Sequence, residues 1–166
     1  MTLLQSLFRQ KAAINEEFFA VIGNVDAEAH AAERLALICL MNHIYVVDRI
    51  FAGHLRGDPH GYTATNTPET PTVEALGGAV LTSDHGYLEL VDALTPAQLA
   101  QTVDFVFTDG QKGRMSREEI LGHVITHGSY HRGEVGQMLK RIAAAPPRDL
   151  FTAYLHRAEP QRRVPV

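Results

Sequence analysis

Apolar side chains recur at spacings of three and four residues along four long segments of this chain, which predicts four amphipathic helices. The segments cover residues 3–22, 29–55, 72–94 and 116–145. The second segment would be about 40 Å long at the rise of an α-helix, and such a length in a small chain favours a bundle. We therefore predict an all-α fold, a four-helix bundle.

Between the third and fourth predicted helices, apolar residues occur at every second position instead of every third or fourth. Val103, Phe105 and Phe107 alternate with their neighbours as in a β-strand. The dipeptide at 109–110, Asp-Gly, is typical of a turn, and residues 111–115 are expected to return as a partner strand. The pattern therefore predicts a small β-hairpin inserted before the last helix.

Loops and helix ends are marked by breakers and caps. Residues 57–71 are rich in Gly, Pro and Thr, which indicates a loop long enough to cross one end of the bundle. Ser116 is followed three residues later by Glu119, the pattern of a capping box at the start of the last helix. We expect a single domain over residues 1–166, with the tail 148–166 packing back on the bundle.

Composition narrows the class of protein. The length of 166 residues suits one domain, and a single Cys excludes a disulfide framework or a zinc site made of several thiolates. With 15 basic and 19 acidic residues, the net charge of −4 argues against nucleic acid as a partner. The start of the chain has no apolar block of signal-peptide type, and the charge-free run at 35–47 is too short to span a bilayer. We expect a cytoplasmic protein with no membrane partner.

The nine histidines carry the candidate chemistry. His127 and His131 are four residues apart, so both imidazoles lie on one face of the last helix and can meet one metal ion. His123 extends this column, but the three together span about 12 Å along the axis, too far for one ion. His43 lies in the most apolar run of the chain, where a buried imidazole needs a partner. A metal ion or a structural hydrogen bond would satisfy each of these side chains.

Two known metal motifs are absent from the sequence. The zinc-protease motif requires Glu directly after the first His, but Gly128 follows His127. A di-iron bundle requires Glu-x-x-His on two helices, and no Glu in the chain has a His three positions later. Cys39, one turn before His43, is interpreted as a small hydrophobic residue outside the site. Asp48 is expected to pair with Arg132 and to hold the two helices in register.

Two segments resemble the DinB/YfiT superfamily of DinB-type damage-inducible proteins. NHIYVVDRIF at residues 42–51 is similar to the second-helix segment of that family, and HGSYHRGE at 127–134 to its fourth-helix segment. In the fourth-helix segment, Glu134 stands where the family usually has Gln. The resemblance implies a bundle with one divalent metal ion per chain (Zn, Ni or Fe) held by His43, His127 and His131. It also implies a homodimer.

The resemblance leaves several functions open. Characterised relatives include metal-dependent thiol transferases and a mycothiol-dependent isomerase, so this protein is expected to be a metal-dependent hydrolase or thiol transferase. Such an enzyme would act on a low-molecular-weight thiol and an electrophilic small molecule. The alternatives are a non-catalytic metal-binding protein of the stress response and a dimeric interaction module. The family name refers to induction by DNA damage and does not imply chemistry on DNA.

Overall fold

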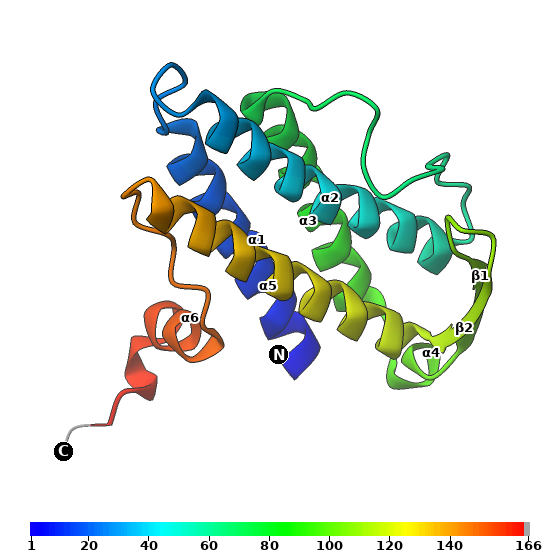
Figure 1. The fold of residues 1–166 in the computed structure, drawn as a ribbon. Coiled ribbons are helices and arrows are strands. Elements are labelled where there is room, and N and C mark those ends of the chain that lie inside the picture. Colours follow the sequence, from blue (N-terminus) through cyan, green and yellow to red (C-terminus); the bar gives the residue numbers. More distant parts are fainter. Residues whose placement is uncertain (165–166) are drawn as a thin grey trace.

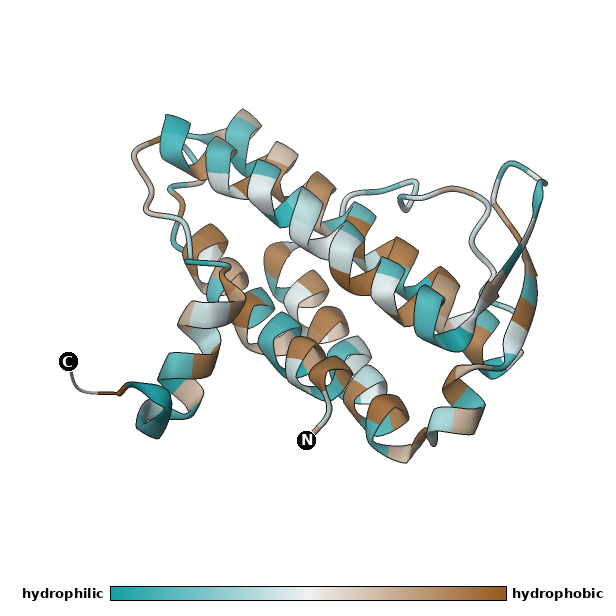
Figure 2. Cartoon of the chain, turned by 90° about the horizontal axis from the view of Figure 1, so that it is seen from below, coloured by the Kyte–Doolittle hydropathy of each residue, from teal (hydrophilic) through white to brown (hydrophobic). Residues whose placement is uncertain are grey.

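The computed structural model describes residues 1–164, and its four long helices and one hairpin confirm the predicted all-α bundle. The long helices are α1 (Leu3–Gly23), α2 (Ala31–Arg56), α3 (Val73–Ala93) and α5 (Arg117–Arg141). α1 packs chiefly against α3, and α2 packs chiefly against α5 (Figure 1). Figure 2 shows apolar and polar segments alternating along each long helix, as expected of amphipathic helices that share a core.

The hairpin lies between α3 and α5 in the chain, as predicted. Its strands β1 (Thr102–Val106) and β2 (Lys112–Ser116) are antiparallel, with Val103 opposite Met115. The capping box of Ser116 and Glu119 then starts α5. A short helix, α4 (Pro96–Leu99), precedes the hairpin and was not predicted, because four residues are too few to show a helical period. Its own capping box, made by Thr95 and Gln98, was the available signal.

The core of the bundle consists of two apolar clusters with a polar layer between them. Ile14, Ile44 and Val80 belong to one cluster, and Phe8, Phe51 and Tyr87 to the other. The polar layer contains five buried side chains that are connected by hydrogen bonds and ion pairs: Lys11, Asn15, Asp48, Asp84 and Arg132. Each of the four long helices therefore contributes polar atoms to the middle of the core.

Two helix ends are set by residues in the left-handed region. Gly57 follows α2 with φ 75°, a conformation that favours glycine, and its N–H donates to the carbonyl of His54. α5 ends at Arg141 rather than near residue 145, because Ala143 adopts φ 57°. The N–H groups of Ala143 and Ala144 then donate to the carbonyls of Lys140 and Leu139, at 3.1 and 3.0 Å. This hydrogen-bond pattern reverses the chain before Pro146.

The C-terminal segment returns along the bundle and is held by charged contacts. Asp149 accepts hydrogen bonds from Arg132 Nε at 2.8 Å and from Gln10 Nε2 at 2.8 Å. Helix α6 (Phe151–Ala158) follows and lies against α1, where Arg157 pairs with Glu17 at 2.6 Å. A 3₁₀ turn, η1 (Pro160–Arg162), follows α6. In both views α6 and the hairpin lie at opposite ends of the molecule (Figures 1 and 2).

Helix α2 is the most apolar element of the fold. By length and composition alone it could cross a membrane, with a mean hydropathy of 1.6 over its most apolar window. Within the structure 61% of that window is buried, which is the environment of a core helix in a bundle.

Candidate metal centre

The structure brings together His43 of α2 with His127 and His131 of α5. One ligand nitrogen from each ring lies within 4.8 Å of the others. His43 Nε2 is 3.2 Å from His127 Nε2. The packing of α2 along α5 (Figure 1) produces this approach. The centroid of the His43 ring is 5.1 Å from that of His127 and 4.8 Å from that of His131. These three side chains could hold one metal ion.

Two of the three rings are oriented through the nitrogen that faces away from the cluster. His43 Nδ1 is 2.9 Å from the carbonyl oxygen of Thr65, and because a carbonyl only accepts, Nδ1 carries the proton. His131 Nδ1 is 2.6 Å from Glu134 Oε2. Both contacts leave Nε2 free to bind a metal, the arrangement that typically surrounds metal-binding histidines. His127 Nδ1 is buried and has no hydrogen-bond partner among residues 1–164.

Burial keeps the inner imidazoles neutral. The pKa of His127 is lowered to about 3. Burial is the largest cause, and repulsion from the neighbouring rings of His131, His43 and His123 adds to it. Burial also lowers the pKa of His43. Metal ions bind the neutral imidazole, so both rings are in the binding form at neutral pH. Two nitrogens bound to one tetrahedral zinc ion lie about 3.3 Å apart. The separation of 3.2 Å between the Nε2 atoms of His43 and His127 fits a shared ion.

The loop between α2 and α3 covers the outer side of His43. The buried Asn42 donates from Nδ2 to Asn66 Oδ1 at 3.2 Å and to Thr67 Oγ1 at 2.8 Å. Together with the Thr65 carbonyl on His43, these bonds attach the loop to one turn of α2. Sequence reasoning missed the loop residues, because a backbone carbonyl gives no signal in the residue type.

Comparison with known families agrees with this geometry. The sequence profile of the DinB family matches residues 1–163, a range that includes all three histidines. The chain belongs to the DinB family. No curated protein matched it. The match confirms the resemblance seen in the two histidine-bearing segments.

Glu134 stands where the DinB family usually has Gln, and in the structure this side chain contacts the ligand candidate His131. Its carboxylate accepts from His131 Nδ1, whereas an amide oxygen would do so without charge. A charged acceptor stabilises positive charge on the imidazole and makes Nε2 a stronger donor to a metal. Glu134 is half exposed, with 46% of its side chain accessible, so solvent weakens this effect.

Two neighbouring side chains lie outside the three-histidine group of the DinB-family chain. The His123 ring packs on Phe51, with centroids 4.7 Å apart, and next to His127 at 5.4 Å. Cys39 Sγ is 3.1 Å from Thr70 Oγ1, a contact with the loop. Neither residue belongs to the group of side chains whose ligand atoms could bind one ion together.

The expected ion pair between Asp48 and Arg132 is wrong. Asp48 instead pairs with Lys11 Nζ at 2.7 Å, and Arg132 pairs with Asp149 at 2.8 Å. Asp48 lies about 140° round α2 from His43, so a side chain at that angle faces α1 rather than the histidines of α5. Lys11 also bonds Asp84, so the ammonium lies between two buried carboxylates.

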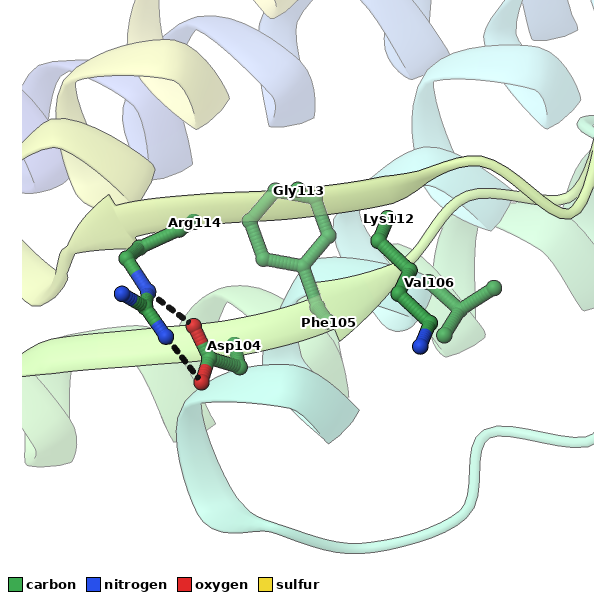
Figure 3. Close-up of a pocket in the computed structure, with 6 residues that line it drawn as sticks. All are labelled: Asp104, Phe105, Val106, Lys112, Gly113 and Arg114. Atoms are coloured by element: carbon green, nitrogen blue, oxygen red, sulfur yellow. Dashed lines mark hydrogen bonds and ion pairs between the residues drawn. The ribbon is translucent and has the colours of Figure 1, made fainter.

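A hollow at the hairpin has both charged and apolar lining residues but none of the histidines. It has a volume of about 630 Å³ and is lined by both strands (Figure 3). Arg114 and Asp104 form a two-bonded ion pair across it, at 2.5 and 2.9 Å. Both side chains are mostly exposed, so the pair is screened by water and its charges compensate each other. The ion pair of the hairpin hollow therefore has no free charge, whereas the histidine group has converging ligand nitrogens.

Proposed function

We propose that this DinB-family protein is a metal-dependent enzyme that transfers a thiol or another group, with one divalent ion held by His43, His127 and His131. The observation that carries the proposal is that ligand nitrogens of three imidazole rings lie close together. Thr65 orients the ring of His43, and Glu134 orients the ring of His131. Structural zinc sites normally have four protein ligands, whereas catalytic sites keep a position open. Three histidines match the catalytic number.

The ion would have one chemical role in this proposal, which is to activate a nucleophile. When bound, a divalent ion would lower the pKa of a thiol or a water molecule and so supply a nucleophile near neutral pH. His43 and His131 hold the ligand nitrogens in place through their outward hydrogen bonds. Imidazole suits zinc, nickel and iron alike, so the ligand set is compatible with each of them.

An apolar hollow beside His43 supports a catalytic role. It has a volume of about 540 Å³, within the range of small-molecule sites, and Leu35, Leu40 and Met138 contribute to its lining. His43 and Asn66 are polar groups on its wall. An apolar part of an electrophilic substrate would bind here with its reactive atom near the histidines.

Metal analysis tests the site. Purified protein exposed to zinc, nickel or iron(II) and then desalted should retain about one ion per chain. His127→Ala should abolish retention, whereas His85→Ala should not, because His85 is an exposed histidine of α3 outside the group. Full retention by His127→Ala, or no retention by the unmodified protein, would contradict the proposed site.

A second experiment tests catalysis separately from binding. The metal-loaded protein should consume a low-molecular-weight thiol in the presence of an electrophile such as a haloalkane or an epoxide. A chelator should abolish the reaction, and readdition of the metal should restore it. Turnover that survives chelation would contradict a metal mechanism. Retention of one ion without turnover on any thiol or water reaction would favour a non-catalytic metal-binding protein.

The homodimer expected from the family stays a prediction. Light scattering during gel filtration should give twice the mass of the 166-residue chain. A monomer at micromolar concentration would contradict it.

A further inference from the structure

Two arginines of α2 line a hollow on the side of that helix away from the histidines. Arg49 and Arg56 are seven residues apart, which is two helical turns and about 10 Å along one face. They lie about 120–140° round the helix from His43. The hollow has a volume of about 340 Å³ and lies between α2 and α3, with the small side chain of Ala52 between the arginines.

Neither arginine has a carboxylate partner within residues 1–164. Five other arginines do form ion pairs with acidic side chains: Arg9, Arg114, Arg132, Arg157 and Arg162. Glu89 lies on the rim of the hollow and is exposed, but it pairs with neither guanidinium. His85 is the other titratable group of the lining. Asp58 lines an adjoining hollow together with both arginines and also pairs with neither. The hollow therefore has two guanidinium groups that no carboxylate of the described residues contacts directly.

Gly86 of α3 gives one guanidinium its position. A Cβ atom at Gly86 would lie 2.9 Å from Arg56 Nη2, so any larger residue would displace that group. The absence of a side chain lets Arg56 lie directly on α3, at the edge of the hollow. Because of this close approach, the guanidinium group of Arg56, the last residue of α2, lines the same hollow as residues of α3.

Ser83 provides an independent sign of a ligand. Its side chain is only 5% exposed and lines the hollow, yet its hydroxyl has no hydrogen-bond partner in the described chain. The neighbouring Thr82 hydroxyl donates to the carbonyl of Gly78 at 3.0 Å, the usual bond for a helical hydroxyl. An unpaired buried hydroxyl is unfavourable, because it has lost its bonds to water without gaining a partner in the protein. The oxygen itself has almost no exposed surface, so the side chain must rotate about χ1 before it can donate to a ligand oxygen in the hollow.

We propose that this hollow binds the phosphoryl group of a small metabolite. Arg49 and Arg56 would neutralise its two negative charges, and the Ser83 hydroxyl, after rotation of its side chain, would donate to a third oxygen. Guanidinium groups bind phosphate through paired N–H donors, and donors from two helices suit a tetrahedral group better than a planar carboxylate. A volume of about 340 Å³ leaves room for a small organic part. This site is separate from the three histidines.

Titration with inorganic phosphate at constant ionic strength, followed by amide NMR, tests the proposal. Saturable shifts should appear for residues 82–86, with a dissociation constant in the millimolar range or below. The double variant Arg49→Gln/Arg56→Gln should weaken binding at least tenfold. The control Lys140→Gln/Arg141→Gln removes the same charge from exposed positions at the end of α5 and should leave binding unchanged.

The variant Ser83→Ala separates a ligand-binding hydroxyl from a structural one. It should weaken phosphate binding severalfold while leaving the thermal midpoint unchanged or raised, because it removes an unpaired buried donor. Equal binding by the arginine variant and its control would overturn the proposal. Tighter binding of succinate than of phosphate would overturn the choice of a phosphoryl group. Metal retention at the histidines should be the same in all variants, so this proposal and the proposed function fail separately.

Discussion

Two polar clusters lie between the long helices of the same bundle, one buried around Lys11 and one partly exposed at the histidines, and they differ in how their atoms are satisfied. In the layer around Lys11, positive groups face carboxylates: Lys11 bonds Asp48 and Asp84, and Arg132 bonds Asp149. In the histidine cluster, nitrogens face nitrogens, with 3.2 Å between the Nε2 atoms of His43 and His127. Charges that compensate each other are complete without a ligand, whereas converging imidazole nitrogens can either share a proton or bind a cation. The contrast separates a buried structural cluster from a partly exposed candidate metal site within one bundle.

The structural cluster has its own weak point at Asp48. Burial raises the pKa of this carboxyl to about 6, although Lys11 and Arg132 act against the rise. One of its oxygens, Oδ1, is buried without a hydrogen-bond partner in the described residues, which leaves its charge less well solvated than that of a surface carboxylate. Asp84 adds a second negative charge nearby. The cluster therefore depends on Lys11 more than on any other member.

The largest expected effect comes from removing Lys11. Lys11→Met would leave Asp48 and Asp84 buried and facing each other, and we expect a loss of about 3–5 kcal/mol in the free energy of unfolding. Chemical denaturation at pH 7 measures it. The matched control is Arg9→Met on the same helix, which breaks an exposed pair with Asp92 and should cost less than about 1 kcal/mol. Equal losses for the two variants would contradict the assigned importance of the buried pair.

The next effect concerns pH. Because the pKa of Asp48 is about 6 in the folded protein and near 3.8 when unfolded, the folded state binds more protons between these values. The stability due to Asp48 is therefore present at low pH and is lost as pH rises through about 6. The difference in unfolding free energy between metal-free wild type and Asp48→Asn should fall by up to about 3 kcal/mol between pH 4 and pH 7. A difference that is constant with pH would refute the raised pKa.

A smaller effect is expected at the partner of His131. Glu134→Ala removes the acceptor on Nδ1, and metal affinity should fall about 10–100-fold. Glu134→Gln keeps an acceptor and should lose less. Competition against a coloured chelator measures both, with the exposed Glu33→Ala on α2 as a control for lost negative charge. If Glu134→Ala and Glu33→Ala behave alike, the hydrogen bond does not tune the site.

The smallest effect on metal affinity is expected at His123. This ring packs on Phe51 and lies outside the three-nitrogen group, so His123→Ala should change the affinity less than about twofold. The same chelator competition applies. A loss as large as that of Glu134→Ala would extend the metal site by one turn of α5.

The residues of the two clusters were not equally visible in the sequence. The spacing of His127 and His131 placed them on one face of a helix, and the apolar surroundings of His43 marked it as needing a partner. Lys11 gave no such signal, because a lysine in an amphipathic helix is usually exposed. The expected partner of Asp48 was wrong for a related reason: its angle on α2 could be calculated, but the helix that lies at that angle could not.

Local rules therefore determined the helices, the hairpin and the shared face of two histidines, since each depends on residues a few positions apart. The pairing of α2 with α5 and of α1 with α3 was decided only by the tertiary structure. That packing brought His43 to the other two histidines, placed the Thr65 carbonyl behind it, and set Lys11 between two carboxylates. Contacts between distant segments depend on how all the apolar faces are buried together, and no single stretch of the sequence contains that information.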